Sequence, residues 1–324
     1  MTITIRDIAE AAGVSIGTVS RALKNQRGLS DETRRAVRRI ARELGYDASR
    51  LRSAKAQRLV FLLHRQHSIF ATNPFFFHVL YGVEEACRDF GIAPTVLATG
   101  PADPLRDQLR LHEPDAVLAA GFFEAEVIDL VAGLELPMAL VDFWMPDRPS
   151  VNPDNAQGGY LATRHLLEGG RRRIAYIAGS LAHFSIRERA QGYRRALFEA
   201  GVLADPDLEV LAPPGVEPDR GAAQAMRQLL RLRQRPQAVF ACNDTAALAA
   251  MQVCHDAGLQ VPGDIAFVGF DNLPAAASAQ LTTLHVDKEG LGRAGVELVM
   301  RGDEMPLQTT LPVELVVRGS SAPL

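Results

Sequence analysis

The sequence predicts an α/β protein with an N-terminal all-α helix-turn-helix head and a body of two parallel α/β subdomains. Three observations support this fold class. Amphipathic helix patterns fill residues 5–46, basic residues concentrate at the N-terminal end, and short apolar runs alternate with helical patterns from Leu59 onward. The helix patterns predict a small helical domain, and the alternation is typical of parallel sheets that are covered by helices on both faces.

The first two helices of the head are predicted from apolar spacing and capping residues. A helix over roughly residues 6–12 has apolar residues three and four positions apart, and Gly13 ends it. Ser15 can cap a second helix, which continues to about Lys24, because its hydroxyl accepts a hydrogen bond from an unpaired backbone N–H. Two short helices that are joined by a tight turn containing glycine form a helix-turn-helix.

A third helix is expected after residue 30. Ser30 is its predicted N-cap, and Asp31 and Glu32 interact favourably with the positive end of the helix dipole. Its apolar stripe contains Ala36, Val37, Ile40, Ala41 and Leu44.

The second helix carries the residues that we predict to contact DNA. In a helix-turn-helix the start of this helix enters the major groove, which places Ile16, Gly17 and Arg21 nearest the base edges. The planar guanidinium of Arg21 can pair with O6 and N7 of guanine. Hydroxyl side chains beside them are Ser15, which is the cap, and Thr18 and Ser20, which are candidates for phosphate contacts. The alternative is a bundle of three amphipathic helices with a solvated basic face and no DNA role. It would explain the charge but not the tight turn between the first two helices.

The distribution of charge also favours a nucleic-acid-binding end. The chain has 35 basic and 38 acidic residues, a net charge of −3, but residues 1–58 hold 13 basic and 6 acidic side chains, a net of +7. The other 266 residues carry a net of −10. Such asymmetry is typical of a DNA-binding segment attached to a body that does not bind DNA. That body is long enough for two domains with sizeable cores.

Cysteine usage and hydropathy indicate a cytoplasmic protein. The cysteines at positions 87, 242 and 254 have no Cys-x-x-Cys spacing, so we expect neither a zinc site nor a disulfide framework. The N-terminus has no signal-peptide pattern, and no apolar run is long enough to cross a bilayer. The polar, basic stretch 47–58 is predicted to be a linker, either helical when it is held by DNA or a flexible tether.

The body contains two consecutive sets of strand and helix patterns, with the change between them near Asp154. Predicted strands are 59–63, 94–98, 116–120, 138–141, 173–178, 208–211, 238–241, 265–268 and 313–318. Predicted helices are 75–89, 156–167, 188–200, 221–232, 245–256 and 288–301. Two parallel-sheet subdomains follow from this order, and because chain remains after the second set, part of it can return to the first subdomain.

No catalytic, metal or cofactor pattern is evident in the body. It lacks a Gly-x-Ser-x-Gly elbow, a Gly-x-x-x-x-Gly-Lys loop, a Gly-x-Gly-x-x-Gly loop and paired histidines with metal-ligand spacing. We therefore expect no enzyme activity and no cofactor. A Rossmann-type enzyme and a solute-binding protein are the alternatives of other classes; the first would need a catalytic constellation and the second would not need a basic head.

Polar side chains just beyond the predicted strands indicate a ligand site instead, because open α/β sheets bind ligands at this edge. They are Asp142, Asn243, Asp244 and Asp271, and Arg189 lies near the start of a helix. Aromatic residues occupy comparable places: Phe75, Phe76, Phe77, Phe122, Phe123, Phe143, Trp144 and Phe184. Charged groups that bond hydroxyls, together with rings that cover C–H faces, suit a polyhydroxylated ligand. For any single residue there is an alternative explanation: the polar residue caps a helix, or the aromatic residue belongs to the core.

These motifs resemble a known family. The stretches AGVSIGTVSRAL and DETRRAVRRIARELGY are similar to the N-terminal domain of the lactose-repressor (LacI/GalR) family of bacterial transcription regulators. Body stretches such as VNPDNAQGGYLATRHLLEGGRRRIAYIAG and AVFACNDTAALAAMQVCHDAGLQVPGDIAFVGFDN resemble the family in the same order. The resemblance covers essentially the whole chain.

The resemblance implies a homodimer that binds a palindromic operator through two heads, and that most often acts as a repressor of a carbohydrate-utilisation operon. It also implies a periplasmic-binding-protein-like body with a small effector, a sugar or sugar derivative, in the cleft between subdomains. A non-sugar effector such as a nucleobase is the alternative. By position, the implied effector residues are Phe75, Phe76, Asp142, His183, Arg189, Asn243 and Asp271.

The implied domains are a head at 1–46, a hinge at 47–58 and an effector-binding and dimerisation domain at 59–324. Its first subdomain covers about 59–154 and 284–306, and its second about 155–281 and 309–320. The hinge departs from the family pattern, in which a leucine wedges into the minor groove. Ala54 or Lys55 stands at that position here, and Leu51 can substitute from one turn earlier.

Overall fold

The computed structural model describes residues 3–23, 29–46, 58–67, 74–100, 102–213, 216–302 and 305–322. The chain forms two compact units, residues 1–56 and 57–324. The predicted hinge residues Leu51, Ala54 and Lys55 lie outside the described residues. Within those residues, no helix is long and apolar enough to cross a membrane.

The head is a bundle of three helices, α1 (Ile5–Ala12), α2 (Ile16–Leu23) and α3 (Asp31–Glu43). Gly13 ends α1 with a positive φ of 64°, a conformation that glycine adopts without strain. Its small core contains Ile8, Val19, Ala22, Val37 and Ala41. Leu44, which was predicted to belong to this stripe, is 36% exposed because α3 ends at Glu43.

The body contains twelve strands in its described residues, and their bounds agree closely with the predicted ones where a strand was predicted. They are β1 (Arg58–His64), β2 (Ala93–Thr99), β3 (Ala116–Ala120), β4 (Met138–Val141), β5 (Ser150–Pro153), β6 (Ile174–Ala178), β7 (Glu209–Leu211), β8 (Ala238–Ala241), β9 (Ala266–Val268), β10 (Thr283–Val286), β11 (Gln308–Leu311) and β12 (Val313–Val316).

Helices alternate with these strands along the described chain. They are α4 (Phe75–Phe90), α5 (Leu105–His112), α6 (Ala125–Ala132), α7 (Asn155–Glu168), α8 (Phe184–Glu199), α9 (Pro218–Leu230), α10 (Asp244–Asp256), α11 (Pro274–Ser278) and α12 (Lys288–Arg301), with short 3-10 turns at 65–67, 206–208 and 319–321. Helix α8 begins four residues before the predicted start at 188.

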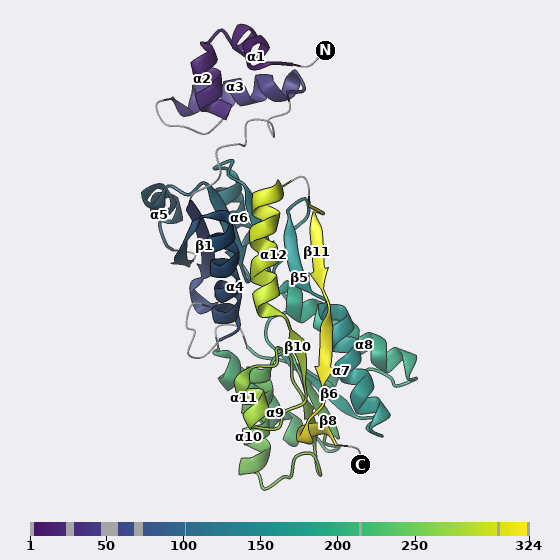
Figure 1. Ribbon diagram of the computed structural model, residues 1–324. Coiled ribbons are helices and arrows are strands. Elements are labelled where there is room, and N and C mark those ends of the chain that lie inside the picture. The colour runs from purple at the N-terminus through teal and green to yellow at the C-terminus, as the bar shows by residue number, and fades with distance from the viewer. Residues whose placement is uncertain are drawn as a thin grey trace. The chain divides into compact units, whose positions relative to one another are not determined.

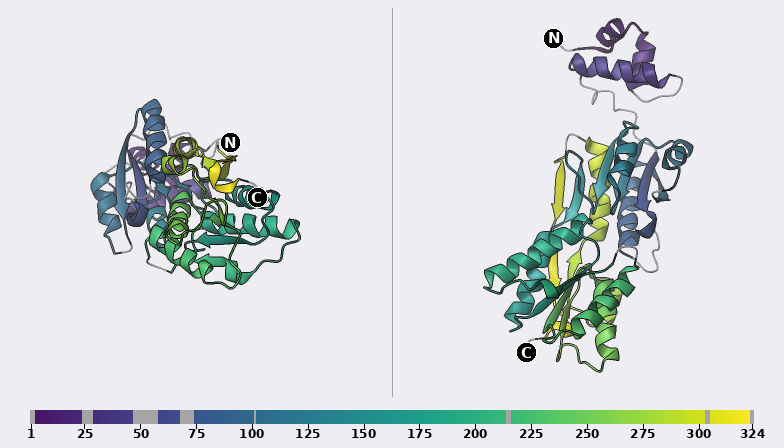
Figure 2. Two further views of the ribbon diagram at one scale, coloured as in Figure 1. Left: turned by 90° about the horizontal axis from the view of Figure 1, so that it is seen from below. Right: turned by 180° about the vertical axis from the view of Figure 1, so that it is seen from behind.

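Two parallel sheets organise the body. The first has the order β11-β5-β4-β3-β1-β2 and the second has the order β7-β6-β8-β9. A two-stranded antiparallel ladder of β10 and β12 accompanies them. Figure 1 shows α4 and α12 side by side over the first sheet, although about 200 residues separate them in the chain. The right-hand view of Figure 2 shows the yellow C-terminal strands running along both halves of the body.

The chain therefore passes between the two sheets at three places: from β5 to α7, from β10 to α12 and from β11 to β12. Two implied boundaries need correction. Strand β10 pairs with β12 in the second half, so the first subdomain resumes at α12 rather than at 284. Residues 308–311 pair with β5 in the first sheet, so the return to the second half begins at Val313 rather than at 309. Strands β5, β10 and β11 were not predicted, because sequences such as SVNP and QTTL lack the apolar run on which the prediction depended.

Glycines allow a close contact between helices α7 and α8. A Cβ atom at Gly192 would lie 2.0 Å from the carbonyl oxygen of Ala156, and one at Gly159 would lie 2.2 Å from that of Arg189. Backbone atoms cannot move aside as a flexible side chain can. The two helices can therefore approach only because both positions lack a Cβ.

We expect Gly192→Ala to lower the free energy of unfolding by about 3 kcal/mol, since overpacking of a close contact costs this much. Urea unfolding of the body measures it. Gly133→Ala is the matched control, because its Cβ would meet only ordinary contacts at 3.4 Å. Equal stability of the two variants would contradict the prediction.

Candidate functional site

The predicted effector residues Asp142, Arg189 and Asp271 come together where strands of the two sheets end. Asp142 follows β4 directly, Asp271 lies three residues beyond β9, and Arg189 belongs to α8, the helix after β6. Arg189 and Asp271 are 4% and 6% exposed, and both acids influence each other and Arg189 electrostatically. Three elements that are distant in the sequence thus contribute one buried cluster of charged groups.

Arg189 is held in place on several sides. Its Nε donates to Oδ1 of Asn155 at 2.8 Å, and its Nη1 donates to the carbonyl oxygen of Cys242 at 2.6 Å. The guanidinium carbon lies 3.6 Å from the ring centroid of Phe270, a cation–π contact. The remaining nitrogen, Nη2, lies 3.7 Å from Oδ1 of Asp271. This last distance suits an ion pair but is too long for a hydrogen bond.

The two carboxylates present oxygen atoms that no protein group satisfies. Oδ1 of Asp142 and Oδ1 of Asp271 are both buried, and neither has a hydrogen-bond partner among the described residues. Both residues also have positive φ angles, 51° and 109°, which cost aspartate about 1–3 kcal/mol. Buried polar atoms without partners are rare in native proteins, so these oxygens are suited to accept hydrogen bonds from a ligand.

The strained backbone of both aspartates is fixed by neighbouring strands. The N–H of Asp142 donates to the carbonyl of Val151 at 3.0 Å, and the N–H of Asp271 donates to that of Leu284 at 2.9 Å. Lys288, which is 8% exposed, donates from Nζ to the carbonyl oxygens of Asp271 and Val286. These contacts hold the two carboxylates in position before a ligand arrives.

Burial dominates the electrostatics of the cluster. It raises the pKa of Asp142 to about 7 and that of Asp271 to about 6, although the charge of Arg189 opposes both shifts. Burial likewise raises the pKa of Asp244 to about 7. Both oxygens of Asp244 are occupied, since Thr283 Oγ1 donates to one at 2.5 Å and the N–H of Leu273 to the other at 2.7 Å. Asp244 therefore positions the loop that carries Asp271.

A pH-dependent effect follows for Asp142. The folded state binds its proton more tightly than the unfolded state, so the free energy of unfolding falls as the pH rises from about 4 to about 7. We expect Asp142→Asn to raise stability by about 2 kcal/mol at pH 8, and this gain to shrink as the pH falls towards 5. Urea unfolding at pH 5, 6, 7 and 8 measures it. A gain that is independent of pH would contradict this origin.

The other predicted effector residues have contacts outside this charged cluster. Phe75 and Phe76, 4% and 3% exposed, begin α4 and pack into the hydrophobic core. Oδ1 of Asn243 accepts from the N–H of Ala246 at 2.8 Å, so Asn243 caps α10. His183 caps the start of α8, its ring lies 4.6 Å from that of Phe122, and burial lowers its pKa.

Two ring contacts join the halves of the body beside the cluster. Phe122 and Trp144, from loops after β3 and β4, contact His183 and Phe184, from the start of α8, with centroid distances of 4.6 and 5.9 Å. Sequence reasoning placed these aromatics at the ligand edge but missed Asn155, Phe270 and Lys288. Only the lysine in HVDKEG gave a usable signal, since a lysine in the first turn of a helix is unfavourable without a partner.

The predicted DNA-contacting residues lie on the exposed side of α2. Oγ of Ser15 accepts from the N–H of Thr18 at 3.0 Å, which is the predicted cap. Ile16 is 48% exposed, Gly17 is exposed, and Arg21 is exposed with its Nε donating to the carbonyl of Gly17 at 3.2 Å. Thr18 and Ser20 are half-buried.

Cys87, Cys242 and Cys254 are buried and form no disulfide bond with one another. Among the described residues, no group of three or more His, Cys, Asp or Glu side chains could hold a metal ion.

Comparison with known proteins assigns both units. The family described as bacterial regulatory proteins, lacI family, matches residues 4–49, and a periplasmic binding protein-like domain matches residues 163–321. The HTH-type transcriptional repressor PurR of Photobacterium profundum is 33% identical over 317 residues, 92% of this chain and 91% of the relative. The ribose operon repressor of Haemophilus influenzae is 34% identical over 316 residues, 94% and 92% of the two chains.

Solved structures agree with this assignment. The transcriptional regulator CelR in complex with cellobiose is similar with a TM-score of 0.75 and 28% identity, over 98% of this chain and 99% of that chain. The lac repressor dimer bound to operator and an anti-inducer shares the fold, with a TM-score of 0.71 and 24% identity, over 99% and 100% of the chains. The relatives are transcriptional repressors and not enzymes. The chain therefore belongs to the LacI family of DNA-binding transcriptional repressors.

Proposed function

We propose that this repressor binds a palindromic operator as a homodimer in the cytoplasm and releases or engages it when a sugar or sugar derivative occupies the Asp142–Arg189–Asp271 cluster. The observation that carries the proposal is the pair of buried, unpartnered carboxylate oxygens beside an immobilised arginine. Such a site offers acceptors and donors in one place, which is what adjacent hydroxyl groups require. The regulated genes would then concern carbohydrate use.

The names of two relatives support a carbohydrate effector. One is a ribose operon repressor, and another similar protein was solved with cellobiose. A nucleobase is the second candidate, because flat rings at the cluster, such as Phe122 and Phe143 with centroids 5.9 Å apart, could also stack on a base. The ligand screen below includes both classes.

The contacts between the halves of the body provide the coupling in this proposal. An effector that bonds Asp142 from one half and Arg189 and Asp271 from the other favours the arrangement in which the two ring pairs also meet. The three chain crossings would transmit this closure to the first subdomain and on to the hinge. A coupling free energy of about 1–3 kcal/mol is typical of allosteric proteins and is sufficient.

The head supplies the other half of the function. Ile16, Gly17 and Arg21 would read bases, Ser15, Thr18 and Ser20 would lie against phosphates, and Leu51, Ala54 and Lys55 would contact the minor groove. Ile16 and Gly17 have no hydrogen-bonding side chain, so sequence preference would depend on Arg21, on methyl contacts and on DNA shape.

Fluorescence anisotropy tests the proposal by measuring how tightly the protein binds DNA from the promoter region of its own gene. The full chain is titrated onto this DNA, and D-ribose, D-glucose, cellobiose and adenine are then added singly. A saturable change in operator affinity with a sugar is the expected result, and a thermal-shift screen should show the same ligand stabilising the protein. If adenine alone changes operator affinity, the effector is a nucleobase and not a carbohydrate. If the protein binds none of these four compounds, the proposed class of effector is wrong.

A further inference from the structure

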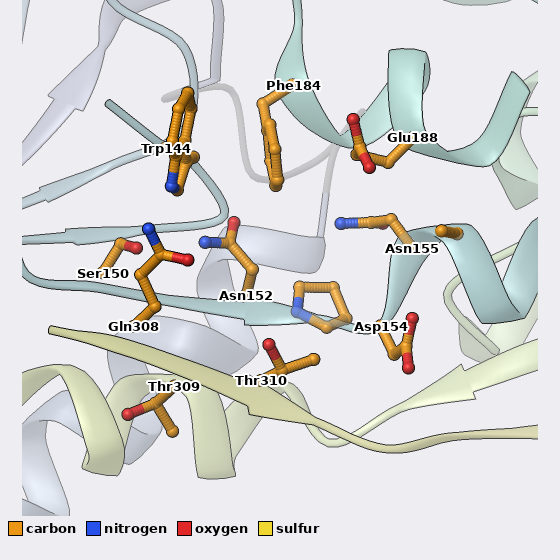
Figure 3. A pocket seen from close by; sticks show the side chains of 12 residues that line it. Trp144, Ser150, Asn152, Asp154, Asn155, Phe184, Glu188, Gln308, Thr309 and Thr310 are labelled. Atoms are coloured by element: carbon orange, nitrogen blue, oxygen red, sulfur yellow. The ribbon is translucent and has the colours of Figure 1, made fainter. Parts of the chain in front are cut away.

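A cavity of about 130 Å³ lies next to the candidate effector cluster, with Asn155 common to both, at the first and third chain crossings (Figure 3). It is lined by residues of β5, β11, the loop after β4 and the start of α7 and α8. One water-sized probe occupies about 10–15 Å³, so the cavity has room for on the order of ten water molecules. This is the size of a single sugar ring.

The floor of the cavity is a polar face formed by two paired strands. In the parallel register, Gln308 pairs with Ser150 and Thr310 with Asn152. Directly paired residues point to the same side of a sheet, and successive residues of a strand alternate. Ser150, Asn152, Gln308 and Thr310 therefore share one face at the edge of the first sheet, and Figure 3 shows Asn152 in its middle. Ser150 and Asn152 are buried on this face, whereas Gln308 and Thr310 are exposed.

Three of the lining side chains have buried polar atoms that lack a hydrogen-bond partner among the described residues. They are Oγ of Ser150, Oδ1 of Asn152 and Nδ2 of Asn155. These residues are only 1%, 6% and 2% exposed. An unsatisfied buried polar group costs about 1–3 kcal/mol. Three of them beside one cavity indicate that a ligand completes their hydrogen bonding.

The existing partners determine what each amide offers. Nδ2 of Asn152 donates to the carbonyl of Phe143 at 3.2 Å, so its Oδ1 is left as an acceptor. Oδ1 of Asn155 accepts from Arg189, so its Nδ2 is left as a donor. An acceptor, a donor and the Ser150 hydroxyl, which can act as either, match a ring that carries several hydroxyl groups.

The upper wall of the cavity and the charges that line it further restrict the class of ligand. Trp144 and Phe184 form the upper wall in Figure 3, with stacked rings 5.9 Å apart at an angle of 26°. The rings give this wall an apolar surface that C–H groups of a sugar can contact. Asp154 and Glu188 line the cavity, and no arginine, lysine or histidine does. Glu188 is paired with Arg187 at 3.9 Å, so Asp154 is the carboxylate that an anionic ligand would meet, which disfavours phosphates and carboxylates.

We propose that this cavity is a second ligand site, distinct from the effector cluster, that binds a neutral polyhydroxylated ring. Its walls come from both halves of the body, with Trp144 and Asn152 on one and Asn155 and Phe184 on the other. Asn155 lies between the two sites, since its oxygen binds Arg189 and its nitrogen lines the cavity. Occupancy of either site stabilises the same arrangement, so a ligand here promotes binding at the effector cluster.

The chain contains a built-in probe for this cavity, because Trp144 is its only tryptophan. The emission of Trp144 in the full chain is followed during titration with D-glucose, D-ribose, cellobiose and D-gluconate. We expect a saturable change with at least one of the three neutral sugars and none with gluconate, the carboxylate analogue of glucose. Lack of response to all three neutral sugars, or an equal response to gluconate, would overturn the proposal.

Three variants separate this site from the effector cluster. Phe184→Ala and Gln308→Ala should weaken the binding that Trp144 reports, the first by about 10-fold. Asp271→Asn should leave that binding intact while it abolishes the response in operator anisotropy. Phe198→Ala is the matched control, since this aromatic residue of the same helix is 83% exposed. Gln308 is exposed on an edge strand, so its replacement leaves the fold intact even where Phe184→Ala does not.

The outcomes distinguish this inference from the proposed function, on which its allosteric role rests. If Asp271→Asn removes the Trp144 response together with the operator response, the body has one ligand site and the inference fails while the proposed function stands. If Trp144 reports binding that Asp271→Asn leaves unchanged but operator affinity never responds, the second site stands and the proposed function fails.

Discussion

Arg189→Ala is expected to weaken effector binding by about 100-fold while operator affinity in the absence of effector is unchanged. Arg189 sits at the centre of the cluster and is 4% exposed. Hydrogen bonds from a charged group contribute about 1.5–3 kcal/mol each, and tenfold corresponds to about 1.4 kcal/mol. Calorimetry with the sugar identified in the screen gives the affinity, and operator anisotropy gives the response.

Companion variants separate the role of this charge from its structural role. Arg189→Ala also leaves Asn155 and Cys242 without their donor, so a loss of stability is expected with it. Asp271→Ala removes the acceptor instead and should abolish the same response. Arg233→Ala, in the exposed turn after α9, is the matched control and should behave as the unmodified chain. A normal effector response in both Arg189→Ala and Asp271→Ala would remove the site assignment.

Arg21→Ala is expected to reduce operator affinity by about 1–3 kcal/mol and to relax the preference at one base pair in each half-site. The side chain is exposed at the face of α2, and its bond to Gly17 uses only Nε. The terminal amino groups can therefore donate to guanine. Anisotropy against an operator and a set of single-base variants measures both effects.

The control for Arg21 is another exposed arginine of the head. Arg42→Ala removes the same charge from α3. It should weaken binding to all operator sequences by the same factor or leave binding unchanged. If Arg21→Ala also weakens binding to every operator variant by the same factor and lowers the salt dependence of that binding, Arg21 contacts a phosphate and its assignment to a base is wrong.

The sequence predicted most elements of the body because periodicity and capping are local signals. The apolar runs of β1, β3, β4 and β8 and the pattern of α12 gave their positions to within a residue or two. Strands β5, β10 and β11 were not predicted, because short polar strands are stabilised by their neighbours rather than by their own composition. Their places follow only from pairings such as that of Gln308 with Ser150.

The two candidate sites divide in the same way. Asp142, Arg189 and Asp271 could be singled out from the sequence because open α/β sheets bind ligands just beyond their strands and because the family resemblance marks these positions. Asn155 and Phe270 could not be, although both contact Arg189 directly. An asparagine in the first turn of a helix and a core ring look ordinary until the fold shows what they contact.

By itself, then, the sequence determined the helix-turn-helix head, the two α/β halves and the acids and arginine of the effector cluster, because each leaves a pattern within a short stretch of chain. The tertiary structure alone decided the polar face shared by β5 and β11, the closure of the halves through Trp144 and Phe184, and the orphaned amides of Asn152 and Asn155. The physical reason is that these features depend on contacts between residues up to about 160 positions apart. Whether a polar group is satisfied depends on partners that only the folded chain brings within hydrogen-bonding distance.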